Sequence, residues 1–175
     1  MRVVGDQTAV AIRAVAEEPE LLGAARELFC EYERSLGVDL CFQGFEAELA
    51  ALPGAYAPPS GCLLVAHIGE LAIGCVALRQ LEPGTAELKR LYVRPQARRL
   101  GLGRELVAQV LEIARQLGYA RVVLDTLPSM REAQRLYEGF GFRDVDAYND
   151  NPLCGVRFMQ IDVSPAEMRP EPPPG

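Results

Sequence analysis

A run of glycines and arginines is the part of this sequence best suited to chemistry. Between residues 98 and 104 the chain reads Arg-Arg-Leu-Gly-Leu-Gly-Arg, and an amphipathic segment follows directly. Glycines at the start of a helix let the backbone approach a ligand without interference from a Cβ atom, and the free N–H groups there favour negative charge. Residues 89–104 also carry six basic side chains and no acidic one. The stretch therefore predicts a site that holds phosphate.

The elements on either side of this loop must position it. Before the loop, apolar residues predict a strand over 86–93, which Pro95 closes. After it, apolar residues recur at helical spacing over 103–117, and Gly118 ends that helix. The compact apolar run 122–125 predicts the next strand. The two strands are thus joined by a crossover helix and run parallel.

The remainder of the chain predicts a mixed α/β domain. Further strands are expected over 8–16, 62–68, 71–80 and 156–163, and further helices over 20–36, around 44–52 and from 128 or 129 to 140. The pair Gly69-Glu70 predicts a two-residue hairpin turn, and the three strands before the glycine loop form an antiparallel meander. One domain is expected over residues 1–163, followed by a Pro-rich disordered tail over 164–175.

Composition bounds the class of protein. The 175 residues, 49% of them hydrophobic, suit one globular domain with its own core. A net charge of −6 disfavours nucleic acid and acidic membranes as partners, so the basic loop is a local feature. The acid-rich first fifty residues are open to two interpretations, solvated helix faces or a negative field that favours cationic substrates. No apolar signal region or bilayer-spanning run is present, so a cytoplasmic protein is expected.

The cysteines and the histidine do not indicate another kind of site. The five cysteines are scattered without C-x-x-C spacing, which argues against a disulfide framework and against a metal site. Cys62 and Cys75 lie in apolar strand-like runs and are expected in the core. His67, the only histidine, also lies in an apolar run, and no nucleophile is near it in the sequence. We therefore expect a structural role for His67 and no bound metal.

Three phosphate-binding motifs can be compared with the glycine loop. A Walker A loop ends in Gly-Lys-Ser/Thr, whereas Gly103 is followed here by Arg104 and Glu105. A Rossmann fingerprint needs three glycines directly after the first strand, but only Gly101 and Gly103 are present and antiparallel strands precede them. The third motif, Arg/Gln-x-x-Gly-x-Gly/Ala, matches residues 98–103.

That third motif is the pyrophosphate loop of the GCN5-related N-acetyltransferase (GNAT) superfamily, which the sequence resembles at two further places. Residues 88–95, Leu-Lys-Arg-Leu-Tyr-Val-Arg-Pro, resemble the central strand of that superfamily, which ends in Val-x-Pro before the loop. Residues 137–142, Tyr-Glu-Gly-Phe-Gly-Phe, resemble its Leu-Tyr-x-x-x-Gly-Phe signature after the next strand. The resemblance covers residues 8–163 and is most specific over 86–142.

The resemblance implies a sheet of six or seven strands, mostly antiparallel, in which the two parallel strands splay apart in a V. It also implies acetyl-CoA as co-substrate, with the pantetheine arm in the V beside free backbone groups of Leu91, Tyr92 and Val93. The pyrophosphate would lie on backbone N–H groups of the loop, where arginines screen its charge. The loop residues expected to bind the cofactor are Arg98, Arg99, Leu100, Gly101, Leu102, Gly103 and Arg104.

The same resemblance implies an N-acetyltransferase in which a primary amine attacks the thioester directly. Tyr137 matches a tyrosine that donates a proton to the departing thiolate. Glu87 matches a glutamate that takes a proton from the amine through water, and Asp125, at the end of its strand, is a second candidate. A backbone N–H near Leu91 or Tyr92 would bind the thioester oxygen. The alternative is a non-catalytic acyl-CoA-binding regulatory module, which the presence of both Tyr137 and Glu87 disfavours.

The sequence leaves the acceptor open. Residues 30–60 and the loop 148–154 are expected to cover the cleft. The side chains expected to line an acceptor pocket are Tyr32, Phe42, Phe45, Tyr56, Tyr148, Asn149 and Asn151. Small polyamines, amino acids, antibiotics and protein amines all satisfy this description. Dimers are common in the superfamily, so a homodimer is an expectation by analogy.

Overall fold

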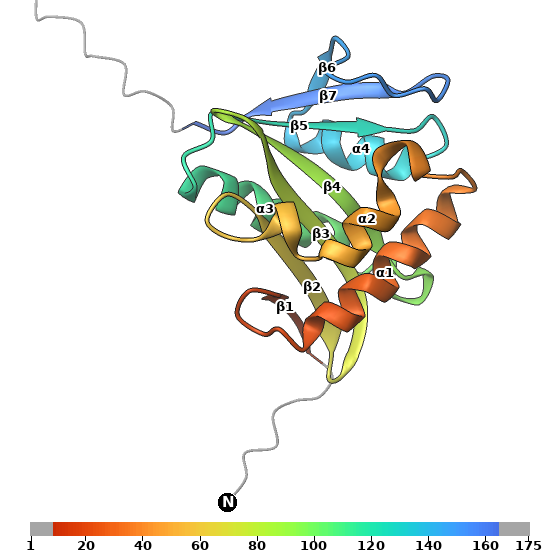
Figure 1. Ribbon diagram of the computed structural model, residues 1–175, viewed down its shortest axis with the longest axis vertical. Helices are drawn as coiled ribbons and strands as arrows, with labels where there is room; N and C mark the ends of the chain where they lie inside the picture. Colours follow the sequence, from red (N-terminus) through yellow and green to blue (C-terminus); the bar gives the residue numbers. More distant parts are fainter. Residues whose placement is uncertain (1–8, 165–175) are drawn as a thin grey trace, which may run out of the picture.

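The computed structural model describes residues 9–164, in which helices cover both faces of one mixed sheet (Figure 1). The seven strands lie in the order β1-β2-β3-β4-β5-β7-β6. The strands are β1 (Val10–Ala14), β2 (Cys62–Ile68), β3 (Leu71–Glu82), β4 (Thr85–Val93), β5 (Arg121–Thr126), β6 (Arg143–Val145) and β7 (Arg157–Asp162). The helices are α1 (Leu21–Leu36), α2 (Phe45–Ala51), α3 (Leu102–Gln116) and α4 (Arg131–Phe140), with short 3₁₀ turns η1 (Cys41–Gln43), η2 (Gly54–Tyr56) and η3 (Pro95–Ala97).

Two hydrophobic clusters fix the helices on opposite faces of the sheet. Helices α3 and α4 pack on one face and α1 and α2 on the other, as Figure 1 shows. The periodic apolar residues of α3, including Leu106, Val107 and Val110, are fully buried. Strands β2 and β3 are buried on both faces, which explains why they read as continuous apolar runs. The predicted α/β class and the antiparallel meander β2-β3-β4 are therefore confirmed.

Strands β4 and β5 are parallel but pair only at their beginnings. Residues 85–87 of β4 align with residues 121–123 of β5, whereas β4 continues to Val93 and β5 to Thr126. Beyond Glu87 the two strands diverge, as Figure 1 shows. In the described chain, the backbone groups on the β5 side of the second half of β4 therefore have no strand partner. The V expected from the sequence is confirmed, and it opens the sheet to a ligand.

A β-bulge redirects the side chains in the second half of β4. Arg90 and Leu91 together face the single residue Val76 of β3. Arg90 adopts a φ of 58°, a left-handed conformation that is costly outside glycine, and the Cys75 thiol donates a hydrogen bond to its carbonyl oxygen at 3.3 Å. The bulge therefore presents Lys89 and Arg90 on the same side, facing η1 and α2, while Leu91 packs toward α3.

The structure departs from the sequence prediction in a few elements. The three-residue strand β6 was not predicted, because so short a segment carries no periodicity. Helix α4 begins at Arg131, since the Met130 N–H instead closes a turn on Leu127. Apart from Ser164, the tail expected over 164–175 lies outside the described residues. Within those residues, none of the helices combines the length and apolarity that a membrane span requires.

Candidate active site

A groove of about 700 Å³ runs along the open side of β4 and over the glycine loop. The starts of α3 and α4 and one side of α1 complete its walls. Nine of the ten predicted cofactor-binding residues line it; the exception, Leu100, is 63% exposed and lies outside the lining. The structure thus brings the strand residues Leu91, Tyr92 and Val93 together with the loop in one elongated space. An elongated ligand suits such a groove better than a compact one.

The N-terminus of α3 faces this groove without a side-chain cap. Gly101 occupies the cap position with a φ of 73° and provides no side-chain hydrogen bond to the helix. The helical hydrogen bonds begin only with the Glu105 N–H, which donates to the Gly101 carbonyl at 3.1 Å. The amides of Leu102, Gly103 and Arg104 are therefore available at the groove. This arrangement favours an anion such as a phosphate.

The six basic residues over 89–104 divide between two places, and the three that were expected to bind the cofactor are the ones at the groove. Arg98, Arg99 and Arg104 line the groove. The other three meet carboxylates: Arg94 lies 2.7 Å from Glu31, Arg90 lies 2.7 Å from Glu48, and Lys89 lies 3.5 Å from Glu87. Glu31 and Glu48 belong to the acid-rich first fifty residues. These two acids therefore neutralise the charges of Arg90 and Arg94, and are not merely solvated residues on helix faces.

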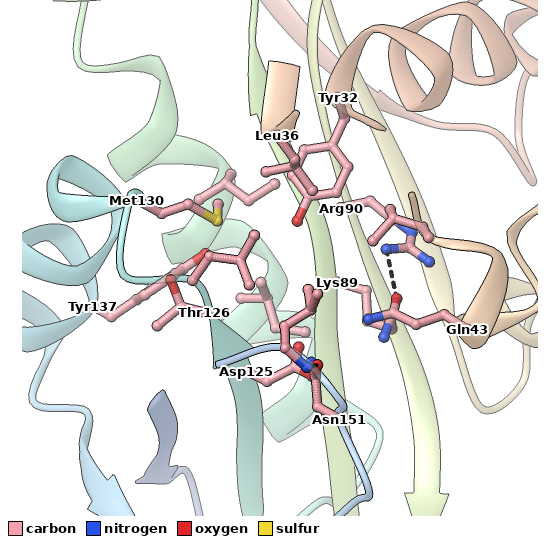
Figure 2. A pocket seen from close by; sticks show the side chains of 15 residues that line it. Tyr32, Leu36, Gln43, Lys89, Arg90, Asp125, Thr126, Met130, Tyr137 and Asn151 are labelled. Carbon is pink, nitrogen blue, oxygen red and sulfur yellow. Dashed lines mark hydrogen bonds between the residues drawn. The ribbon is translucent and has the colours of Figure 1, made fainter. Parts of the chain in front are cut away.

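A smaller cavity continues the groove into the mouth of the V (Figure 2). Tyr32, Leu36, Leu91 and Met130 line both spaces, so the two are continuous. We call this smaller space the inner cavity. Its far end opens into a space of about 180 Å³ that we call the polar chamber, because all of its lining residues are polar or charged. The residues shared by the inner cavity and the polar chamber are Gln43, Lys89, Asp125 and Asn151.

Tyr137 and Thr126 lie on the inner cavity where α4 meets the end of β5 (Figure 2). Tyr137 is 4% exposed, and its ring packs against Phe142 at 5.5 Å between centroids. Burial raises the pKa of the Tyr137 phenol, so it is fully protonated at neutral pH. The buried Thr126 hydroxyl has no hydrogen-bond partner among the described residues. Because buried polar groups are nearly always paired, this hydroxyl is available to a water or a ligand in the inner cavity.

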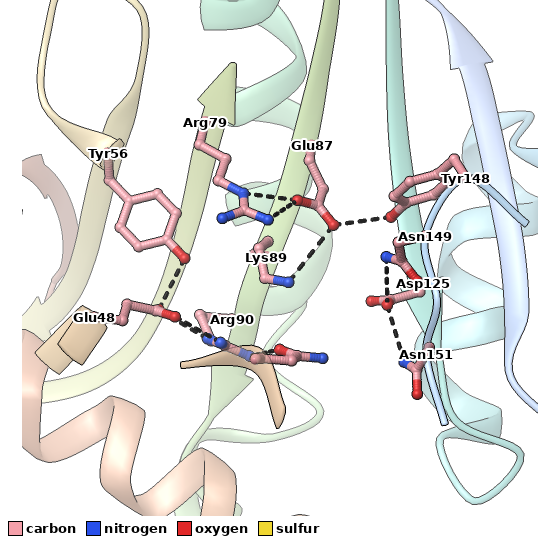
Figure 3. A network of polar contacts seen from close by, with 11 residues as sticks. Glu48, Tyr56, Arg79, Glu87, Lys89, Arg90, Asp125, Tyr148, Asn149 and Asn151 are labelled. Atoms are coloured by element: carbon pink, nitrogen blue, oxygen red, sulfur yellow. Dashed lines mark hydrogen bonds and ion pairs between the residues drawn. The ribbon is translucent and has the colours of Figure 1, made fainter. Parts of the chain in front are cut away.

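Glu87, the carboxylate predicted as general base, is fully buried and fully engaged (Figure 3). Its Oε2 accepts a hydrogen bond from Arg79 Nε at 2.7 Å, and its Oε1 accepts one from the Tyr148 hydroxyl at 3.0 Å. Lys89 Nζ lies 3.5 Å from the same Oε1. Glu87 lines none of the three spaces described above. The geometry gives it contact with Lys89 and Tyr148 rather than with a substrate.

Asp125, the second carboxylate candidate, lines both the inner cavity and the polar chamber. It lies near the end of β5, on the opposite wall of the V from Lys89. Its Oδ2 accepts hydrogen bonds from Asn149 Nδ2 at 3.3 Å and from Asn151 Nδ2 at 3.1 Å (Figure 3). The loop after β6 thus folds back over the V and holds this carboxylate in place. Asp125 can contact a bound substrate directly.

The other residues expected at the acceptor pocket separate into two groups. Tyr32, Asn149 and Asn151 line the cavities. Phe45 and Tyr56 are each 2% exposed and belong to the core under α1 and α2, and Tyr148 contacts Glu87. The side chain of Phe42 lies outside what the structure describes. Within the described residues, no group of three or more His, Cys, Asp or Glu side chains is placed to hold a metal ion.

Sequence reasoning missed Lys89, Thr126 and Gln43 as lining residues of the cavities. Thr126 and Gln43 carry no signal in the sequence, since threonines and glutamines have many ordinary positions. Lys89 carries one: of 18 lysine and arginine residues it is the only lysine. The structure places that single lysine 8% exposed at the opening of the V.

The pair Arg90–Glu48 anchors the bulge of β4 to α2. Arg90 donates from Nε and Nη2 to the two Glu48 oxygens at 3.0 and 2.7 Å, and both side chains are largely buried. Burial by itself would raise the pKa of Glu48, but the hydrogen bonds and charge of Arg90 outweigh it and lower that pKa from its ordinary 4.5. The pair therefore stabilises the fold while Glu48 is ionised.

We expect Glu48→Gln to lower the free energy of unfolding by about 3 kcal/mol at pH 7, because it leaves the Arg90 charge buried without a counterion. A carboxylate whose pKa is lowered by folding contributes stability above its unfolded pKa and loses it as the pH falls through the folded value. The difference in the free energy of unfolding between wild type and variant should therefore disappear as the pH falls below about 4.5. Urea unfolding at several pH values measures this difference, and a pH-independent difference would contradict the ionic role.

The sheet with its V, the groove and the glycine loop agree with the acetyltransferase class that the sequence resembles, and comparison with known proteins shows that class. The Acetyltransferase (GNAT) family model matches residues 20–142. An uncharacterized N-acetyltransferase of Schizosaccharomyces pombe is 42% identical over 148 residues, which cover 83% of this chain and 91% of that protein. The chain belongs to the GNAT family of acetyltransferases.

Solved structures support the same fold. A GNAT-family acetyltransferase from Staphylococcus aureus has a TM-score of 0.73 and 19% identity, covering 89% of this chain and 99% of that chain. A putative acetyltransferase from Salmonella typhimurium, solved with acetyl-CoA, has a TM-score of 0.64 and 18% identity, covering 91% of this chain and 96% of that one. These likenesses show that the V and its flanking helices form a GNAT fold.

Proposed function

We propose that this enzyme transfers the acetyl group of acetyl-CoA to a primary amine by direct attack of the amine on the thioester. One observation carries the proposal: a groove over an uncapped helix N-terminus leads into a cavity at the mouth of the V, and a buried tyrosine of α4 and an ordered carboxylate of β5 both line that cavity. The groove suits the donor and the cavity suits the reacting atoms. The cytoplasmic location and the homodimer expected from the sequence stay predictions.

The residues of the groove fit acetyl-CoA in three respects. The free amides at the start of α3, with Arg98, Arg99 and Arg104 beside them, suit a pyrophosphate. The unpaired edge of β4 at Leu91–Val93 suits the amides of a pantetheine arm. The unpartnered Thr126 hydroxyl offers a hydrogen bond where the groove enters the inner cavity. When bound there, acetyl-CoA supplies an acetyl group activated as a thioester.

The chain's own groups then account for the proton movements. As the new N–C bond forms, the C–S bond breaks, so one proton must leave the amine and one must reach the sulfur. Asp125, which lines the cavities and is held by two asparagines, takes the amine proton directly or through a water. Tyr137 donates a proton to the sulfur, a role that its protonated, buried phenol supports. A backbone N–H near Leu91 or Tyr92, at or just after the bulge, stabilises the thioester oxygen.

Glu87 has a positioning role in this proposal. Glu87 holds Lys89 and Tyr148 in place by direct contacts. It does not line any of the cavities itself. Asp125→Asn should therefore lower kcat/KM for the amine about 100-fold, and Glu87→Gln should lower it by much less. Both variants should keep the wild-type affinity for acetyl-CoA, because neither residue lines the groove.

An amine-library screen with a thiol-release readout tests the proposal and identifies an acceptor for these variants. Isothermal titration of acetyl-CoA with the same proteins is the control for the donor site. If Glu87→Gln lowers kcat/KM for the amine more than Asp125→Asn does, the general base is Glu87 and not Asp125. Acetyl-CoA binding without thiol release for any amine would instead support a non-catalytic binding module.

A further inference from the structure

The polar chamber lies at the far end of the cavity from the donor groove, and its walls carry both signs of charge. About 180 Å³ in size, it is lined by Gln43, Glu48, Arg79, Lys89, Asp125, Asn149, Asp150 and Asn151. No apolar side chain lines it within the described residues. A pocket of this kind fits a small polar molecule and offers nothing to an aromatic or acyl-chain acceptor. The charges on its walls therefore decide what enters.

Two of the five charged residues that line the chamber, Glu48 and Arg79, are neutralised by close partners elsewhere in the fold. Glu48 forms an ion pair with Arg90 at 2.7 Å and also accepts a hydrogen bond from the Tyr56 hydroxyl at 2.8 Å. Arg79 forms an ion pair with Glu87, in which its Nε and Nη2 each lie 2.7 Å from Oε2. Asp150 is exposed to solvent. Besides Asp150, two charged groups facing the chamber lack such a close ionic partner in the described residues.

The first is Lys89, on the β4 wall. Its ammonium carries three N–H donors, yet its only carboxylate within 4.0 Å in the described chain is Glu87, at the long distance of 3.5 Å. The side chain is nevertheless only 6% exposed, and it borders the chamber. A buried cation with unused donors favours an anionic ligand. Burial lowers the pKa of Lys89, which a bound anion would counteract.

The second is Asp125, on the β5 wall. The side chains that contact it are the neutral amides of Asn149 and Asn151. Within the described residues no basic side chain lies within 4.0 Å of it, so its charge is left for a ligand. Lys89 and Asp125 border both the inner cavity and the polar chamber, one on each side of the V (Figure 2).

We propose that the acceptor is an amino acid whose free carboxylate binds Lys89 while its amine lies at Asp125, next to the thioester end of the groove. This inference rests on the proposed amine acetylation and names its substrate class. One ligand then satisfies the cation of β4 and the anion of β5 together. A diamine or polyamine fits less well, because its second ammonium would face Lys89 and Arg90, and the unpaired carboxylate on the chamber besides Asp125, that of Asp150, is exposed to solvent.

The test compares each of a panel of L-amino acids with its own α-amide, in which the carboxylate alone is neutralised, and with putrescine. Thiol release by the wild-type enzyme should show kcat/KM at least tenfold higher for the preferred acid than for its amide, as expected for one charge-assisted bond. In Lys89→Gln this ratio should fall to about one. Lys89→Arg, which keeps the charge, should retain a preference for the acid.

The matched control is Arg135→Gln, which removes one positive charge from an exposed position on α4 and should keep the full ratio. Thermal protection of each variant by acetyl-CoA reports that the fold and the donor groove are intact, and does not depend on the acceptor. Equal or better turnover of amides or putrescine by the wild type would overturn the amino-acid assignment while leaving amine acetylation standing. The same holds if Lys89→Gln lowers turnover but keeps the wild-type ratio of acid to amide. Absence of thiol release from every amine would overturn both proposals.

Discussion

Tyr137→Phe should lower kcat about 100-fold while leaving the KM for acetyl-CoA within about twofold, the range expected when a general acid is removed. The substitution deletes one hydroxyl at the inner cavity and keeps the ring, whose packing against Phe142 anchors the end of α4. The phenol is buried and protonated at neutral pH, so its deletion removes a proton source without removing a charge. Steady-state kinetics with saturating acetyl-CoA and an identified amine measure the effect.

Tyr32→Phe is the matched control for this prediction. Tyr32 reaches the same inner cavity from α1, on the opposite side of the V from Tyr137 (Figure 2). Burial, partly offset by the charge of Arg90, raises the pKa of Tyr32 to about 12, so this phenol is also protonated at neutral pH. The two variants remove the same atom from two sides of one cavity. Loss of turnover in Tyr32→Phe with full turnover in Tyr137→Phe would assign the proton to Tyr32 instead.

Gly103→Val should weaken acetyl-CoA binding by about 100-fold or more and leave a folded protein. A Cβ atom at Gly103 would lie 3.5 Å from Leu136 Cδ2 and 4.0 Å from Val93 Cγ2, which are ordinary contacts. Both neighbours line the groove, so the added side chain would occupy groove space rather than core space. The pyrophosphate would then lose more than one charge-assisted hydrogen bond, each worth roughly 1.5–3 kcal/mol. Isothermal titration with acetyl-CoA measures the loss.

Gly139→Val provides the control for this substitution. Gly139 also lies in a helix, α4, and a Cβ atom there meets nothing within 4 Å. The two variants make the same change in helix propensity, in which valine is more favourable than glycine, but only Gly103 borders the groove. Unchanged affinity in a folded Gly103→Val protein would contradict the placement of pyrophosphate at this loop.

The donor side could be predicted from the sequence because its determinants are local. Glycines, a helix start and three arginines within seven residues form the loop whatever the distant chain does. The flanking strand and helix follow from periodicities of a few residues, and the structure places them as expected. The single exception in the loop, Leu100, is exposed because its side chain points away from the groove that its neighbours line.

The chemistry of the acceptor side could not be predicted, because it depends on pairs far apart in the chain. Arg90 and Glu48 are 42 residues apart, and Arg94 and Glu31 are 63 apart. The sequence shows these arginines beside a phosphate loop, but only the folded chain shows that acids from α1 and α2 neutralise them. The same holds for Glu87, whose partner Tyr148 lies 61 residues away.

The sequence by itself therefore determined the order of elements apart from the short β6, the parallel crossover and the glycine loop at the start of α3, since each depends on neighbouring residues and on backbone conformation. Tertiary structure decided which charges stay available. The bulge in β4 turns Lys89 and Arg90 to one side. Glu48 then neutralises Arg90, whereas Lys89 faces Asp125 across the V. Charge neutralisation depends on distance in space, and a sequence does not contain that distance.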